Sequence, residues 1–370
     1  MPQRPTDRRI ALVLQGGGAL GAYQIGVYQA LHEHGFDPDW VAGTSIGAIN
    51  GAIIAGNPAE TRGPMLDKFW TMLSRADPLD PAKLPDLARQ IYGTWSAYAA
   101  IWTGERHFFT PRAFPPVAPV ASAETASYYD TAPLKGLLES VIDFDLLNTG
   151  TVRFSLGMVH VKSGRLRYFD NRFQRIGVEH IMASGALPPG FPAVEVDGEL
   201  WWDGGVYSNT PLEVVLDDYP RHDTLCFMVD LFNAVGKEPR SIPEVMARQK
   251  DIQYATRSDH DIEDYAKIHT LRRAVQALHE RLNHEQRANP DIRALAALGC
   301  HTTMQIVHLI YPEASWGELS TKDVDFSRAR LAERRALGYR DGSRAMTAAP
   351  WEKPVPRHTG VVLYEIAGTD

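Results

Sequence analysis

The pentapeptide Gly43-Thr44-Ser45-Ile46-Gly47 is the part of the sequence whose residue types and spacing could most directly do chemistry. It has the pattern G-x-S-x-G and stands between a predicted strand and a predicted helix. A serine on such a sharp turn must adopt strained backbone angles, and flanking glycines remove the Cβ clashes that would forbid them. We therefore interpret Ser45 as a nucleophile whose turn is shaped by Gly43 and Gly47. The alternative is a small-residue turn that serves only packing.

The segment Gly16-Gly17-Gly18-Ala19 opens the first predicted helix and offers consecutive backbone N–H groups, which suit an oxyanion or a phosphate. Its continuation to Gly21 also fits G-x-G-x-x-G, the pattern of dinucleotide-binding loops. A dinucleotide site would need an acidic residue at the end of the second strand, whereas this strand ends in Gly43-Thr44-Ser45. Neighbouring parallel strands would bring the glycine loop beside Ser45. We therefore favour an oxyanion hole, with the amides of Gly17, Gly18 and Ala19 as donors.

A nucleophilic serine needs a base, and Asp203-Gly204-Gly205 supplies a candidate carboxylate. The glycines Gly204 and Gly205 allow a tight turn that exposes the Asp203 side chain, although Asp-Gly-Gly is also a common turn. A Ser-Asp-His triad would instead require a histidine after the acid, and the candidates are His222, His301 and His308. The fold that carries such triads places several strands before its nucleophile. Ser45 follows only the second strand, which disfavours a triad.

The elements that must position these residues are indicated by apolar runs and by the glycines that end them. Residues 10–14 and 40–42 predict strands, and residues 20–34 and 46–55 predict helices, which is the signature of a doubly wound parallel sheet. A hairpin is expected over 152–161 and 166–169, a second around Asp197-Gly198, and further strands over 225–231 and 305–310. We predict an α/β fold of three layers, α/β/α, with a mainly parallel central sheet.

Two regions depart from this alternation. Residues 62–130 are rich in Trp and Phe and include a Pro- and Ala-rich stretch over 111–126. They predict a partly helical insertion that caps a pocket, or alternatively a helical excursion with ordinary core aromatics. Residues 242–282 and 328–345 predict charged helices. We expect a catalytic domain over residues 8–220, followed over 221–370 by the completion of the α/β fold and a helical extension.

Four short segments of the sequence together resemble the patatin-like phospholipase family. The resemblance covers roughly residues 8–215 and lies in residues 15–21, the Ser45 pentapeptide, Ala183-Ser184-Gly185-Ala186-Leu187-Pro188-Pro189 and the Asp203 turn, in family order. It implies a Ser–Asp dyad without histidine, an oxyanion hole from the glycine loop, and hydrolysis of acyl esters in lipids. The family often has Arg or Lys where this chain has Leu20, which points to ester hydrolysis in general rather than to phospholipids in particular. The C-terminal part resembles an extension of some bacterial members and suggests no chemistry.

Composition limits the other function classes. The net charge of −7 argues against nucleic acid and against tight docking on anionic membranes, although transient contact with a membrane surface is compatible with it. The sequence shows no metal-ligand pattern and therefore predicts neither metal nor cofactor. Cys226 and Cys300 are expected to be reduced and buried. Without a signal-peptide core or an apolar spanning stretch, we expect a cytoplasmic protein.

Two alternatives from other classes stay open at this point. A non-catalytic acyl-chain binder could keep the fold, although the nucleophile, glycine loop and acid are all present. A nucleotide-binding α/β protein could use the glycine loop. The expected partner is a lipid or acyl-ester substrate, which could be a phospholipid, lysophospholipid, glyceride or short polyester.

Overall fold

The structure is a computed structural model that describes residues 3–77, 85–113, 122–312, 321–356 and 359–366. Its centre is a nine-stranded sheet with the order β11-β10-β9-β1-β2-β5-β8-β7, and β6 pairs with β5. The six strands from β11 to β5 run parallel, and β6, β7 and β8 are antiparallel to their neighbours. The strands are β1 (Arg9–Leu14), β2 (Trp40–Gly43), β5 (Arg153–His160), β6 (Leu166–Asp170), β7 (Val194–Val196), β8 (Glu199–Asp203), β9 (Thr224–Asp230), β10 (Met304–Ile310) and β11 (Val361–Glu365).

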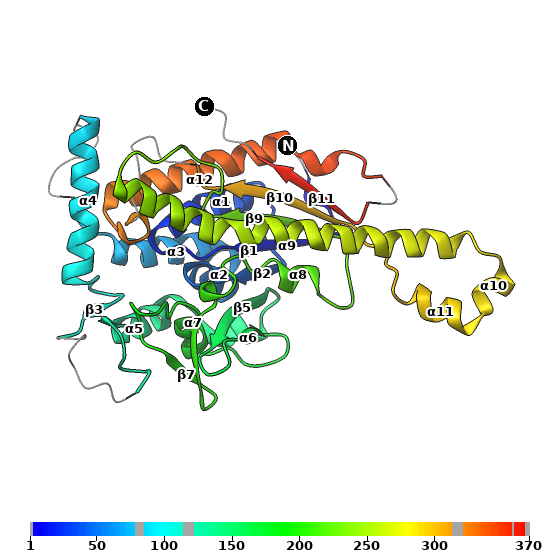
Figure 1. The fold of residues 1–370 in the computed structure, drawn as a ribbon, viewed down its shortest axis with the longest axis horizontal. Coiled ribbons are helices and arrows are strands. Elements are labelled where there is room, and N and C mark those ends of the chain that lie inside the picture. The colour runs from blue at the N-terminus through cyan, green and yellow to red at the C-terminus, as the bar shows by residue number, and fades with distance from the viewer. Residues whose placement is uncertain (1–2, 78–84, 114–121, 313–320, 357–358, 367–370) are drawn as a thin grey trace.

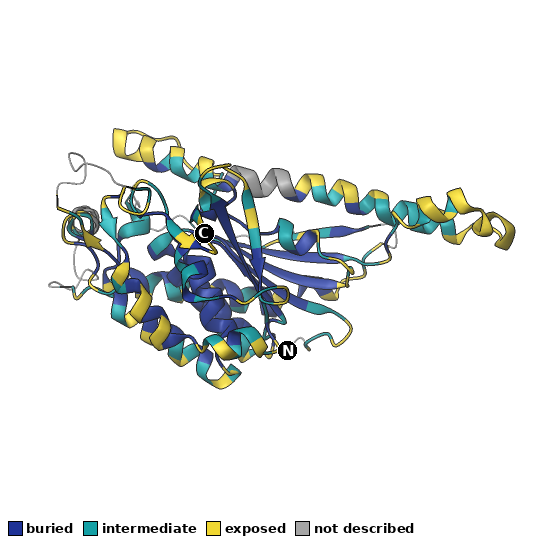
Figure 2. Ribbon diagram, turned by 90° about the horizontal axis from the view of Figure 1, so that it is seen from below, coloured by how far each residue is buried: buried dark blue, intermediate teal, exposed yellow. Residues whose placement is uncertain are grey.

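Helices cover both faces of this sheet, which confirms the predicted three-layer α/β/α fold with a mainly parallel sheet. Alternate residues of β1 point to opposite faces, as a pleated strand requires: Ile10, Leu12 and Leu14 belong to one apolar cluster, and Ala11 and Val13 to another. The first cluster includes residues of α1 (Ala22–Glu33), α2 (Ile46–Ala55), α3 (Ala59–Leu73), α5 (Ala132–Val141), α6 (Phe144–Thr149), α7 (Val178–Ser184) and α12 (Arg328–Ala348). The second includes residues of α8 (Glu213–Leu216) and α9 (Ile242–Glu280). Figure 2 shows the sheet as the buried centre.

The hairpins predicted from turn residues are also confirmed. β5 and β6 pair antiparallel, as do β7 and β8. The second hairpin turns at Asp197 and Gly198, whose φ values of 53° and 78° are both positive, as a type I′ turn demands. Cys226 and Cys300 are free and buried, as expected.

The way β8 joins the sheet brings distant residues together. Leu156 of β5 pairs with Gly43 of β2 on one side and with Phe169 of β6 on the other. Two residues further along, Met158 pairs with β6 again and with Asp203 of β8. β8 therefore takes the side of β5 that β2 leaves when it ends. This arrangement places Asp203 just beyond the end of β2, where the Ser45 turn begins.

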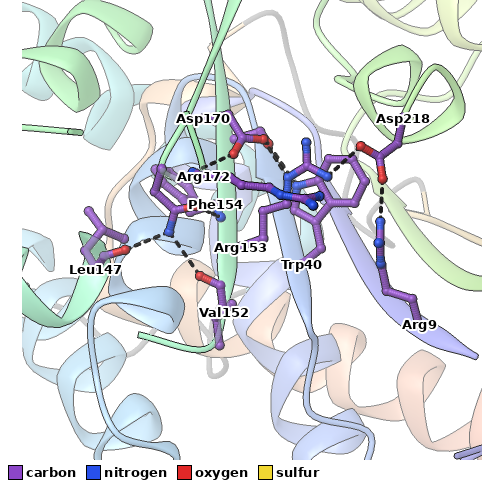
Figure 3. A network of polar contacts seen from close by, with 11 residues as sticks. Arg9, Trp40, Leu147, Val152, Arg153, Phe154, Asp170, Arg172 and Asp218 are labelled. Atoms are coloured by element: carbon purple, nitrogen blue, oxygen red, sulfur yellow. Dashed lines mark hydrogen bonds and ion pairs between the residues drawn. The ribbon is translucent and has the colours of Figure 1, made fainter. Parts of the chain in front are cut away.

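A buried ionic network holds the opposite, amino end of the sheet (Figure 3). The Arg153 guanidinium donates to Asp170 and Asp218, each at 2.7 Å, and stacks 3.7 Å from the Trp40 ring centre. Arg9 reaches the second oxygen of Asp218 at 2.6 Å. Because these residues come from β1, β2, β5, β6 and the segment after α8, the network fixes the register of strands whose far ends carry the predicted catalytic residues.

The insertion after α2 contains α3, α4 (Asp86–Thr103) and a short ladder of β3 (Thr110–Pro111) with β4 (Tyr129–Asp130). Residues 114–121, the middle of the predicted Pro- and Ala-rich stretch, lie outside the described residues. Figure 1 shows α4 standing across the end of the molecule toward which β10 points. Where it is described, the insertion is therefore mainly helical with one short ladder, and it lies at the carboxyl end of the parallel strands (Figure 1).

The C-terminal part extends the sheet and adds one long helix. β9, β10 and β11 continue the sheet beyond β1, so the sheet runs across the boundary expected at residue 220. The helices predicted over residues 242–282 and 328–345 are confirmed as α9, of 39 residues, and α12. The far end of α9 carries α10 (His284–Ala288) and α11 (Pro290–Ala296), which project from the body (Figure 1). Among the described residues, no helix has the length and apolar character needed to cross a bilayer.

Candidate active site

Ser45 lies on a strained turn between β2 and α2. Its φ of 56° and ψ of −125° fall in the region that side chains rarely adopt, as the pentapeptide predicted. The two flanking glycines permit the close approach: a Cβ on Gly43 would collide with the Gly47 carbonyl, and a Cβ on Gly47 with the Leu14 carbonyl. Such strain persists only where surrounding contacts hold it.

Ser184 supplies one of those contacts. Its buried hydroxyl accepts a hydrogen bond from the Ser45 backbone N–H at 3.1 Å and donates to the Gly157 carbonyl at 2.8 Å. The hydroxyl thereby ties the Ser45 turn to β5. In the sequence, Ser184 stands out only as part of a motif and has no evident role, because its contacts join residues far apart in the chain.

Asp203 ends β8 and is 1% exposed. Its Oδ1 accepts a hydrogen bond from the Gly205 N–H at 2.7 Å, through the tight turn that Gly204 and Gly205 allow. Burial raises the pKa of Asp203 to about 7, against the opposing effect of hydrogen bonds from the Ser45 side chain and the Gly205 amide. The Asp203 carboxyl therefore interacts with the Ser45 side chain, and its raised pKa lies near neutral pH.

The glycine loop lies beside this pair. Gly16, Gly17 and Gly18 line the same cavity as Ser45 and Asp203, and the side chain of Ala19, the next residue, is fully buried. Asn209 binds both backbone groups of Gly16. Its side-chain Nδ2 donates to the Gly16 carbonyl at 2.9 Å, and its backbone carbonyl accepts from the Gly16 N–H at 3.1 Å. The Gly16 amide is thus engaged with the protein itself.

Gln15 fixes the start of the loop through a buried chain of hydrogen bonds. Its Oε1 accepts from the backbone N–H groups of Leu231 and Phe232, and its Nε2 donates to the Thr210 hydroxyl at 2.9 Å. Thr210 donates to Asp230 at 2.9 Å, and Asp230 pairs with His308 at 2.9 Å. This chain links three strands at their carboxyl ends, and sequence reasoning did not find it.

None of the three candidate triad histidines lies in the site. His308 is buried on β10 against Asp230 and is not among the residues that line the cavity. His222 precedes β9, and His301 precedes β10 and faces Glu280. Because the carboxyl ends of parallel strands meet at one edge, residues that precede these strands lie at the opposite edge from Ser45.

A cavity of about 260 Å³ opens beside Ser45 and Asp203. Apolar side chains dominate its wall, and Phe109 contacts both Tyr129 and Phe191, with ring centres 4.8 and 5.3 Å apart. Among the described residues that line it, none is Lys, Arg or His. Leu20, at the position where the family often has Arg or Lys, is fully buried in the core. The cavity suits an uncharged, chain-like group.

Both departures from the α/β alternation contribute to this wall. The insertion supplies Ile101, Phe108 and Phe109, and the C-terminal part supplies Tyr254, Val324 and Phe326. The turn η4 (Lys322–Val324) also sits on the glycine loop, where a Cβ on Gly18 would collide with the Asp323 carbonyl. The C-terminal part, to which the sequence assigned no chemistry, therefore shapes the cavity.

Comparison with known proteins gives a family match over most of the region just described. The family described as "Patatin-like phospholipase" matches residues 12–216, and a second, described as "Patatin phospholipase", matches residues 252–358. A lysophospholipase NTE1 of Mycosarcoma maydis is 26% identical over 251 residues, which is 67% of this chain and 11% of the relative. Human patatin-like phospholipase domain-containing protein 6 is 43% identical over 76 residues, which is 20% of this chain and 6% of the relative. The aligned segments thus span small parts of these curated relatives.

Among solved structures, VipD from Legionella pneumophila aligns over 94% of this chain and 68% of its own chain, with 14% identity and a TM-score of 0.42.

Proposed function

Because this chain belongs to the patatin-like phospholipase family, whose members hydrolyse carboxylic esters, we propose that it cleaves acyl esters of lipids with Ser45 as nucleophile and Asp203 as base. The observation that carries the proposal is the buried Asp203 carboxyl. The Ser45 side chain interacts with this carboxyl, whose pKa of about 7 suits proton transfer at neutral pH.

The proposed reaction has two halves. Asp203 accepts the Ser45 proton as the hydroxyl oxygen attacks the ester carbonyl, and the amides of the glycine loop stabilise the resulting oxyanion. Since the Gly16 N–H already donates to Asn209, we assign this role to Gly17, Gly18 and Ala19. Protonated Asp203 then gives its proton to the leaving alkoxide. Water, deprotonated by Asp203, then attacks the acyl carbon; the bond to the Ser45 oxygen breaks, the acid is released, and Asp203 returns the proton to Ser45.

The cavity supports a substrate with an apolar acyl chain. Its wall is aromatic and aliphatic, and its described lining holds no basic side chain to bind a phosphate. Glycerides, lysophospholipids, phospholipids and short polyesters all carry the required ester. The absence of lining cations in the described part of the wall favours selection by the acyl chain over selection by an anionic head group.

Each of the two remaining alternatives can be distinguished from this proposal by a single measurement. A non-catalytic acyl-chain binder would bind fatty acid but would not react with a fluorophosphonate, which labels activated serines. A nucleotide-binding protein would retain NAD or ATP. The close packing of Asp323 on Gly18 disfavours a nucleotide, since a pyrophosphate would need that approach to the loop.

The deciding experiment compares single substitutions on a soluble p-nitrophenyl ester at saturation. Ser45→Ala should abolish turnover, and Asp203→Asn should lower kcat by roughly 10²–10⁴-fold, because an amide cannot accept the serine proton. His222→Gln, His301→Gln and His308→Gln serve as controls, with circular dichroism matched to the parent protein. A histidine variant as inactive as Ser45→Ala, together with an active Asp203→Asn protein, would overturn the dyad in favour of a triad.

A further inference from the structure

The helix α4 carries three large aromatic side chains that face away from the protein. Trp95 is 71% exposed, Tyr98 is 50% exposed and Trp102 is 80% exposed. Their spacing of three and four residues puts them on one side of the helix, and we call this side the aromatic face of α4. A monomeric surface seldom gathers three such side chains without a partner, because their exposure to water is unfavourable.

The other sides of α4 are held by the body of the protein. The Ser96 hydroxyl donates to Asp325 at 3.0 Å, and the Tyr129 hydroxyl donates to the Ile101 carbonyl at 2.8 Å. Ala100 is fully buried. The orientation of the helix is thus determined by contacts that do not involve the aromatic face, and this face points outward as a consequence.

The helix that carries the aromatic face also contributes to the wall of the catalytic cavity. Ile101, which precedes Trp102 in the chain, lines the cavity that contains Ser45. In Figure 1, α4 stands at the same end of the molecule as the first turns of α9. Those turns add exposed apolar side chains of Ile242, Val245 and Met246. Exposed apolar side chains therefore gather at the end of the molecule where the cavity lies.

The chemistry of the face selects its partner. Trp and Tyr are the residues that settle at the boundary between lipid acyl chains and head groups. Residues 90–103 of α4 contain no Asp, Glu, Lys or Arg, and the chain carries a net charge of −7, so attraction to anionic lipid is not the driving force. The partner that fits is a surface of zwitterionic lipid, entered by aromatic side chains.

We propose that the aromatic face of α4 docks on a zwitterionic lipid surface and thereby presents the catalytic cavity to lipid molecules in that surface. The proposal rests on the proposed function for its meaning, because docking supplies the lipid ester that Ser45 attacks. The docking itself is a binding event and does not need hydrolysis. It can therefore be measured with the nucleophile removed.

The test uses the full chain with Ser45→Ala and phosphatidylcholine vesicles in a sedimentation assay. Trp95→Ser combined with Trp102→Ser should weaken vesicle binding at least about tenfold, since binding strength follows the apolar area buried in the interface. The matched control combines Phe173→Ser with Tyr219→Ser, which are 73% and 80% exposed and lie outside α4. This control should bind as the parent protein does. In the protein that keeps Ser45, the rate of hydrolysis on vesicles is compared with the rate on a soluble ester. This ratio should fall at least about tenfold for the α4 variant, Trp95→Ser with Trp102→Ser, and should not fall for the control.

Three results would overturn the docking proposal: equal vesicle binding by the α4 variant and its control, binding confined to anionic vesicles, or an α4-dependent self-association of the protein without lipid. The last result would assign the face to a second copy of the chain. A different pattern marks failure of the proposed function. There, vesicle binding would depend on the aromatic face as predicted while the protein with Ser45 intact hydrolysed no ester.

Discussion

A carboxyl group that acts as a base near neutral pH needs a pKa well above that of a solvated aspartate, and Asp203 reaches this through burial at the end of β8. The cost is that its charged form is disfavoured in the folded protein. The hydrogen bonds from Ser45 and Gly205 limit this cost without removing it. In the proposed reaction, Asp203 therefore links both catalysis and stability to pH.

We expect kcat/KM for a soluble ester to rise with pH and to level off above about 7, as Asp203 loses its proton in the free enzyme.

The free energy of unfolding should change with pH in the opposite direction. Between about pH 4 and pH 7 the unfolded chain has an ionised aspartate and the folded protein a neutral one, so the free energy of unfolding falls as pH rises. Asp203→Asn removes this effect. Its stability relative to the parent protein, measured by urea unfolding, should rise by on the order of 2–4 kcal/mol from pH 4.5 to pH 8. A pH-independent difference would contradict the assignment.

Ser184 acts through the backbone of the nucleophile. Ser184→Ala should leave the Ser45 N–H without its acceptor, which lowers stability by about 1–3 kcal/mol and kcat by at least about tenfold with little change in KM. Ser155→Ala is the matched control, because the Ser155 hydroxyl is equally buried and bonds Trp40 and Asp170 at the amino end of the sheet. It should lose comparable stability and keep its kcat. Equal kcat in the two variants would show that Ser184 is only structural.

At the scale of elements, the glycine loop depends on the packing of α1 against α12. The loop leads into α1, and α12 packs closely against α1. A Cβ on Gly26 of α1 would collide with the Arg335 carbonyl of α12, and a Cβ on Gly338 of α12 with the Tyr23 carbonyl of α1. Helices approach this closely only where side chains are absent. The C-terminal helix thus supports the element that begins at the proposed oxyanion hole.

Gly26→Ala should therefore lower the free energy of unfolding by at least about 2 kcal/mol, because the added methyl must push the two helices apart. Gly136→Ala in α5 is the control, since nothing lies within 4 Å of a Cβ at that position. It should raise stability by about 0.5–1 kcal/mol through the higher helix propensity of alanine. Urea unfolding of both variants measures the contrast, and a neutral Gly26→Ala would mean that α12 yields easily.

At the scale of the whole molecule, the sheet joins the catalytic segment to the C-terminal part. β1 pairs with β2 on one side and with β9 on the other, and β10 and β11 continue from β9. A fragment that ends at residue 220 would expose the edge of β1 that pairs with β9, although five of the six β1 residues are buried. The glycine loop would also lose η4 and α12.

We expect the fragment of residues 1–220 to lack a cooperative unfolding transition and to aggregate, as judged by circular dichroism and size-exclusion chromatography. Replacing α10 and α11, residues 283–299, with a short glycine-serine linker should by contrast leave ester hydrolysis within about twofold. These helices have no buried residue and project from the body (Figure 1). A folded and active fragment of residues 1–220 would make the expected domain boundary an independent folding boundary.

The sequence by itself determined the local features of this protein. The strained Ser45 turn, the two hairpins and the alternation of strand and helix were all predictable, because glycine positions and apolar spacing act over a few residues. The three-layer fold followed from that alternation. Ser45, Asp203 and the glycine loop could be proposed as a site because each sits in a recognisable local context.

Only the tertiary structure decided how these pieces meet. It placed β8 on the side of β5 that β2 leaves, so that Asp203 reaches Ser45. It also revealed that Ser184, Gln15 and Asn209 hold the site, and that residues of the C-terminal part line the cavity. These contacts join residues far apart in the chain. Their formation depends on strand order and on burial, which local spacing does not encode.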